Sequence, residues 1–247
     1  MQLSFIAGQA RWTWHWLRNI RLLCSIGLAL PIVLVYGGPL VRSKRKSFPV
    51  MLAFLITGPV GILFYNLFPG CGSQHLLPQR FPFFPLPIGA IARVYLEPVA
   101  IEGPCHAIPS LPMAWTLLAW WYSQGLMWWE RSIAMTFLVF TGVATLGTGE
   151  HYFVDLVVAF PLALLIEAIG SSSRSYRDPQ RVSAFLFGLA VTLAWLVALR
   201  DREKLFWASP VVPWALAAAT IALARMRHSK LQEKSGADQN EESASCQ

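Results

Sequence analysis

Charged residues are scarce in this chain. They make up 13% of the 247 residues, whereas an ordinary soluble domain has about 25%. Hydrophobic residues make up 55% of the sequence. This composition excludes an ordinary soluble domain and predicts a protein whose surface faces lipid.

The long apolar runs also lack the alternation of polar and apolar residues that membrane-spanning strands show. A uniformly apolar run is typical of a helix, which satisfies its own backbone hydrogen bonds inside the bilayer. Seven runs are close to the roughly 20 residues that a spanning helix needs. We therefore predict an all-α fold, a polytopic transmembrane bundle of about seven helices. They fall near residues 20–36, 49–68, 112–129, 132–146, 151–170, 182–199 and 206–224.

A dense basic patch is missing, although the formal net charge is +7. The cations lie in short loops beside the apolar runs, which argues against nucleic acid as a partner. When alternate loops are assigned to two sides, twelve of the 20 Lys and Arg residues fall on one side, among them those at 42–46, 174–181 and 225–234. The positive-inside rule makes that side cytoplasmic. The loop at 69–111 and the turn at 147–150 are then extracytoplasmic.

Apolar residues are sparse at the end of the chain. Residues 234–242 cannot bury enough apolar surface to become ordered. We expect one transmembrane domain over residues 1–227 and a disordered cytoplasmic tail over 228–247. The long connection at 69–111 is rich in Pro and Phe, and a loop of that length is usually functional or disordered. We expect it to cover the external face as an active-site loop.

Only two charged residues lie clearly inside apolar runs, Asp155 and Glu167. An Asp at a helix centre costs about 2.5–3.5 kcal/mol on insertion scales, so each needs an explanation. His151 precedes Asp155 by four residues, which places both side chains on one face of a helix. Such a pair is either a structural contact or an oriented imidazole that acts as base, metal ligand or nucleophile. Glu167 has no partner in the sequence and is interpreted as a snorkelling or helix-packing residue.

A second polar segment, residues 106–112, enters the third apolar run from the same side as His151. Ser110 is a favoured helix N-cap residue, and Pro112 is tolerated in a first helical turn. The N-terminus of a helix presents backbone N–H groups and the positive end of the helix dipole, which suit a phosphate. By itself this motif is equally well explained as a simple helix start.

Together these segments resemble the type 2 phosphatidic acid phosphatase superfamily. The resemblance rests on Ala-Ile-Pro-Ser-Leu at 107–111 and Ala-Thr-Leu-Gly-Thr-Gly-Glu-His-Tyr-Phe-Val-Asp at 144–155, within a motif core of about 65–165. Residues 68–72 are similar to the first family motif. The branch that the chain resembles is the inositol phosphorylceramide synthase-like, or aureobasidin-resistance-like, group.

The resemblance implies a multi-pass membrane phosphatase or phosphotransferase with an extracytoplasmic active site. Its substrate would be a phospholipid or another phosphorylated lipid in the bilayer, and it would need neither a metal nor another cofactor. His151 would form a phosphohistidine, Asp155 would orient His151, and Ser110 would help to hold the phosphate.

The resemblance fails at one position, where a family histidine protonates the leaving group and this chain has Pro112. His106 is a candidate substitute acid, with an ordinary surface residue as the alternative. Arg80 lies in the long loop and is a candidate phosphate ligand because Arg matches phosphate oxygens, although a lipid headgroup contact is equally open.

Three functions therefore stay open. The leading hypothesis is a lipid-phosphate phosphatase or phosphotransferase that acts through phosphohistidine. The alternative is a catalytically impaired relative that binds phosphorylated lipid without turnover, because Pro112 replaces the acid. A transporter would require interrupted helices and polar residues in paired halves, which the sequence does not show.

Overall fold

The computed structural model describes residues 32, 48–70, 72, 108–171, 175–201, 209 and 211–244. These residues form six α-helices and one 3-10 turn, with no strand among them. The all-α prediction is confirmed for this part of the chain. The first predicted run, at 20–36, lies outside the described residues except for Ile32. In chain order the elements are α4 (Phe48–Leu67), α7 (Leu111–Tyr122), η3 (Ser123–Gly125), α8 (Trp128–Gly147), α9 (Phe153–Gly170), α10 (Pro179–Asp201) and α12 (Val211–Ala244).

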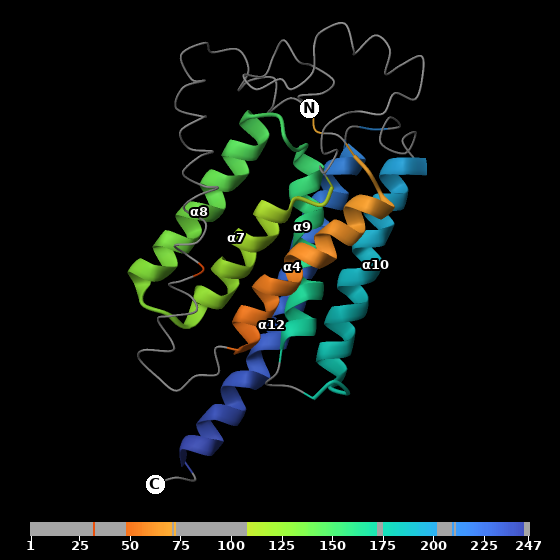
Figure 1. Ribbon diagram of the computed structural model, residues 1–247. Helices are drawn as coiled ribbons and strands as arrows, with labels where there is room; N and C mark the ends of the chain where they lie inside the picture. The colour runs from red at the N-terminus through yellow and green to blue at the C-terminus, as the bar shows by residue number, and fades with distance from the viewer. Residues whose placement is uncertain are drawn as a thin grey trace, which may run out of the picture.

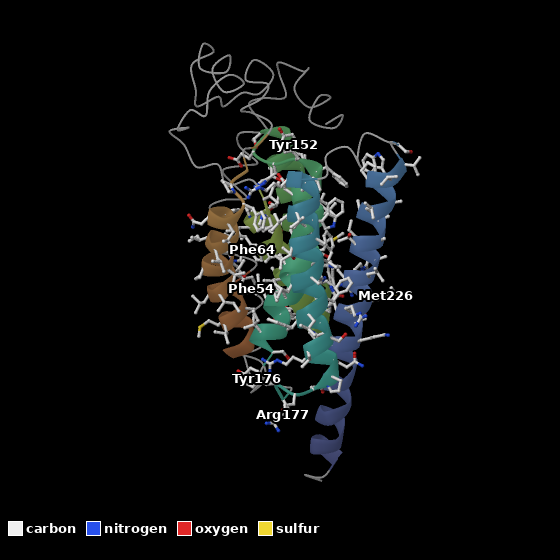
Figure 2. All side chains as sticks on the ribbon, turned by 90° about the vertical axis from the view of Figure 1, so that its right-hand side faces the viewer. Phe54, Phe64, Tyr152, Tyr176, Arg177 and Met226 are labelled. Carbon is white, nitrogen blue, oxygen red and sulfur yellow. The ribbon has the colours of Figure 1, made fainter. Side chains whose placement is uncertain are left out.

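Helix α9 is the centre of the bundle. It contacts α4, α7, α10 and α12, and 14 of its 18 residues are buried. Figure 1 shows α7 to the left of α9 and α10 to its right, and Figure 2 shows α4 and α12 on opposite sides of the bundle. A helix enclosed in this way is apolar on all its faces, as the sequence of α9 is.

Three described helices are long and apolar enough to cross a membrane. They cover Val50–Leu67, Phe153–Gly170 and Pro179–Arg200. The described residues therefore hold three candidate spans, whereas the sequence predicted about seven over the whole chain.

The predicted third span, at 112–129, is wrong at its C-terminal end. Helix α7 has only 12 residues and ends at Tyr122. The side chains of Ser123 and Gln124 both donate to the carbonyl of Trp120, at 2.7 and 3.0 Å, and so complete the end of this helix. The next helix, α8, begins at Trp128, earlier than the predicted residue 132.

Helix α12 runs past the domain boundary expected at residue 227. It continues to Ala244. His228 Nδ1 lies 2.7 Å from Glu167 Oε2, Gln232 Nε2 donates to Glu167 Oε1 at 2.6 Å, and Leu231 is buried. Glu167 thus has two partners, which the sequence interpretation did not find. Polar residues that bind a buried carboxylate resemble a solvated tail in composition.

Candidate active site

Three separate segments meet at the end of the bundle where α4 ends and both α7 and α9 begin (Figure 1). Ser110 N–H donates to the carbonyl of Asp155 at 3.3 Å, which ties the start of α7 to the start of α9. An added Cβ on Gly72 would lie only 2.1 Å from the Glu150 carbonyl oxygen. The backbone at residue 72 can therefore come this close to the backbone at residue 150 only because residue 72 is a glycine. The three segments that carried the resemblance are therefore neighbours in space.

The His151–Asp155 pair forms at the first turn of α9. Asp155 Oδ2 accepts a hydrogen bond from Tyr152 N–H at 2.8 Å and lies 3.5 Å from His151 Nδ1. His151 precedes the helix, which begins at Phe153, so the expected arrangement on one helical face is wrong. The pair forms because the turn after α8, with Gly149 at a φ of 76°, brings the imidazole back over the helix start.

Both members of this pair are buried. Asp155 is 0% exposed and His151 is 5% exposed. The second carboxylate oxygen, Asp155 Oδ1, has no hydrogen-bond partner. Because buried polar atoms are nearly always paired, an unpaired carboxylate oxygen marks a place where strain, function or a ligand must account for it.

Ser110 occupies the N-cap position of α7 but does not act as a cap. Its backbone is extended there, with φ −71° and ψ 106°, and its side chain makes no capping hydrogen bond. The hydroxyl is 0% exposed and has no partner. Pro112 lies in the first turn, as predicted. The start of α7 therefore presents an unpaired, buried hydroxyl at the positive end of the helix dipole, a suitable arrangement for an anion.

Tyr65 also reaches this site, and the sequence interpretation did not identify it as functional. It lies in the last turns of α4, is 8% exposed, and its hydroxyl meets the backbone N–H of Leu111 close to Asp155. The only signal in the sequence is a polar hydroxyl three residues before the glycine-rich segment at 68–72.

Two predicted site residues lie outside the described residues. These are Arg80, the candidate phosphate ligand, and His106, the candidate substitute acid. Both stay predictions. The described part of the site thus consists of His151, Asp155 and Ser110, with Tyr65 beside them.

The family of the chain follows from a comparison with protein-family models. Residues 15–169 match the model of the PAP2 superfamily. That segment is more than half of the chain and contains the whole site, whereas α10 and α12 lie beyond it. No curated protein and no solved structure matches the chain. On the extent of the family match, which includes the two motifs around Ser110 and His151, the chain belongs to the PAP2 superfamily.

Proposed function

We propose that this protein is a membrane enzyme that removes or transfers the phosphate of a phosphorylated lipid through a phosphohistidine at His151. Membership of the PAP2 superfamily indicates phosphatase-type activity on phosphorylated lipids. Three apolar helices long enough to cross a bilayer support a substrate that is itself held in the membrane. The inositol phosphorylceramide synthase-like branch remains part of the proposal.

The observation that carries the proposal is the unpaired hydroxyl of Ser110. It is fully buried at a helix N-terminus, and its own backbone N–H is bonded to Asp155. A phosphate there would accept a hydrogen bond from this hydroxyl and would lie at the positive end of the α7 dipole. Donors fixed in advance stabilise the transferred phosphoryl group without reorganisation during the reaction.

In the proposed reaction His151 Nε2 attacks phosphorus. The N–P bond forms as the bond between phosphorus and the leaving oxygen breaks. Asp155, 3.5 Å from Nδ1, orients the ring and stabilises the positive charge that develops on it. Attack by water on the phosphohistidine then gives hydrolysis, and attack by an acceptor hydroxyl gives transfer.

The proposed site faces the extracytoplasmic side. This orientation rests on the excess of Lys and Arg in the opposite loops. Figure 2 supports a clear separation of the two ends, with Tyr152 near one end of the bundle and Tyr176 and Arg177 near the other. Asp155 and Glu167 lie twelve residues apart on α9, toward these two ends.

A membrane-impermeant thiol reagent tests this orientation in intact cells. Single cysteines are introduced as Ser73→Cys or Ser175→Cys, with the four native cysteines replaced by serine. We expect labelling at position 73 and protection at position 175. Labelling at position 175 alone would reverse the orientation and leave the chemistry of the site unchanged.

One observation favours the alternative of a relative that binds phosphorylated lipid without turnover. Pro112, which cannot donate a proton, lies in the first turn of α7 next to the unpaired hydroxyl of Ser110. The same pocket would then recognise a phosphate and leave it intact.

Purified protein incubated with labelled lipid monophosphates and diphosphates decides between the two functions. We expect phosphate release and an acid-labile, base-stable phosphoprotein, and we expect His151→Ala to lower turnover by about 10⁴-fold or more. His228→Ala removes a second buried histidine and is the matched control. An inactive wild type that becomes active through Pro112→His would favour the binding protein. A fully active His151→Ala variant would exclude phosphohistidine.

A further inference from the structure

The proposed reaction needs a proton donor at the end of the bundle that holds the site. When the leaving oxygen of a lipid monoester departs, it is an alkoxide, which is a poor leaving group unless it is protonated. Among the described groups, His151 is the nucleophile and Asp155 is committed to Tyr152 and His151. Pro112 has no proton to give. His106 lies outside the described residues, and helix α4 offers a candidate donor within them.

Helix α4 brings Tyr65 to this position. At Gly61, α4 lies so close to α7 that an added Cβ on this glycine would be 2.1 Å from Leu111 Cδ2. Tyr65 follows Gly61 by four residues, so it lies one turn further along the same face of α4, toward the site. Its hydroxyl meets the backbone N–H of Leu111, the first residue of α7.

The contact with the Leu111 N–H determines whether the Tyr65 hydroxyl oxygen donates or accepts a hydrogen bond. The Leu111 N–H is one of the helix donors without a partner inside α7, so it donates to the phenol oxygen. The burial of Tyr65 disfavours the phenolate left after proton loss, and this N–H partly offsets that effect. Ser110 is the preceding residue, so the phenol and the phosphate-binding hydroxyl flank the same helix start.

We propose that Tyr65 is the general acid of this enzyme and then its general base. The inference rests on the proposed phosphohistidine reaction. As His151 Nε2 bonds to phosphorus and the P–O bond breaks, the Tyr65 hydroxyl gives its proton to the departing oxygen and becomes a phenolate. In the second step the phenolate takes a proton from water, the resulting hydroxide attacks phosphorus, and the N–P bond breaks. Tyr65 and His151 are then restored.

The test compares leaving groups in Tyr65→Phe. We expect kcat for an alkyl lipid monophosphate to fall by about 10²–10⁴-fold, the usual contribution of general acid catalysis. Formation of phosphohistidine from p-nitrophenyl phosphate should stay near the wild-type rate, because nitrophenolate leaves without a proton. Hydrolysis of that intermediate needs the base, so the phosphoprotein should accumulate in the variant.

Tyr122→Phe is the matched control. Tyr122 is at the other end of α7, and its hydroxyl is buried without a partner. We expect this variant to keep wild-type kcat on both substrates. The assignment of Tyr65 is overturned if a folded Tyr65→Phe variant forms phosphohistidine from the two substrates with the same loss of rate, or with no loss from either. Absence of turnover and of phosphohistidine in the wild type would instead overturn the proposed function, and the role of Tyr65 with it.

Discussion

Helix α9 carries two buried pairs of a carboxylate and a histidine, one toward each end. Asp155 lies near His151 at the start of the helix, and Glu167 lies near His228 at its end. Both carboxylates are almost fully buried, at 0% and 2% exposure. Each pair therefore has a buried carboxylate on α9 and a buried histidine from outside that helix, and the two pairs differ in how completely their polar atoms are paired.

The pair at Glu167 is complete. One oxygen is 2.7 Å from His228 Nδ1 and the other accepts from Gln232 at 2.6 Å. The His228 ring stacks on Trp121, with ring centroids 4.3 Å apart and planes at 14°. This pair joins α7, α9 and α12, so its contacts hold helices together.

The pair at Asp155 is incomplete. Its imidazole is 3.5 Å away, one carboxylate oxygen is unpaired, and so is the nearby hydroxyl of Ser110. An unpaired buried polar group costs about 1–3 kcal/mol. A structural pair has no reason to retain that cost, whereas a binding site recovers it when a ligand arrives. The comparison supports the proposal that His151 and Asp155 serve a reaction, whereas the contacts of Glu167 and His228 hold helices together.

Matched amide substitutions give the largest expected difference between the two pairs. Asp155→Asn should lower kcat by about 10²–10⁴-fold, because an amide fixes the wrong tautomer and cannot stabilise the imidazolium. Glu167→Gln should keep kcat near wild type and lower the melting temperature instead. Kinetics and thermal unfolding of both purified variants check this crossed pattern. If both variants lose activity in parallel, the division into a catalytic and a structural pair is wrong.

Truncation gives a smaller effect and tests the structural pair alone. A chain that ends at Arg227 lacks His228 and Gln232, whereas one that ends at Gln232 keeps both partners of Glu167. We expect the shorter chain to be less stable by about 1–3 kcal/mol for the unpaired carboxylate. For a domain of this size, Tm falls by about 2–4 °C per kcal/mol. Equal Tm values for the two chains would show that these contacts do not stabilise the bundle.

Local patterns in the sequence predicted much of the fold and part of the site. Helix α9 follows from one apolar run, whereas His151 lies near Asp155 through the turn before the helix and not through the four-residue helical spacing that the sequence suggested. The partners of Glu167 come from α12, 61 and 65 residues later, and no local pattern records that contact. The end of α7 was misplaced because the polar residues that close it lie between tryptophan-rich apolar segments.

Tyr65 shows a different limit of sequence interpretation. A tyrosine inside an apolar run is normally read as an amphipathic residue near a membrane interface. Its role depends on the height at which α4 packs against α7, which the contact of Gly61 with Leu111 sets. The relative position of two packed helices along their axes depends on both of them, so the sequence of α4 alone does not predict it.

Gly70 and Ile108, which flank residues 73–107 in the sequence, lie close together. An added Cβ on Gly70 would lie 3.6 Å from the Ile108 side chain. Two ends held this close can be joined by connections of different lengths, because doubling the length of a flexible loop adds only about 0.6 kcal/mol of closure entropy. The length of the connection between these two residues can therefore change in evolution at little cost to the bundle.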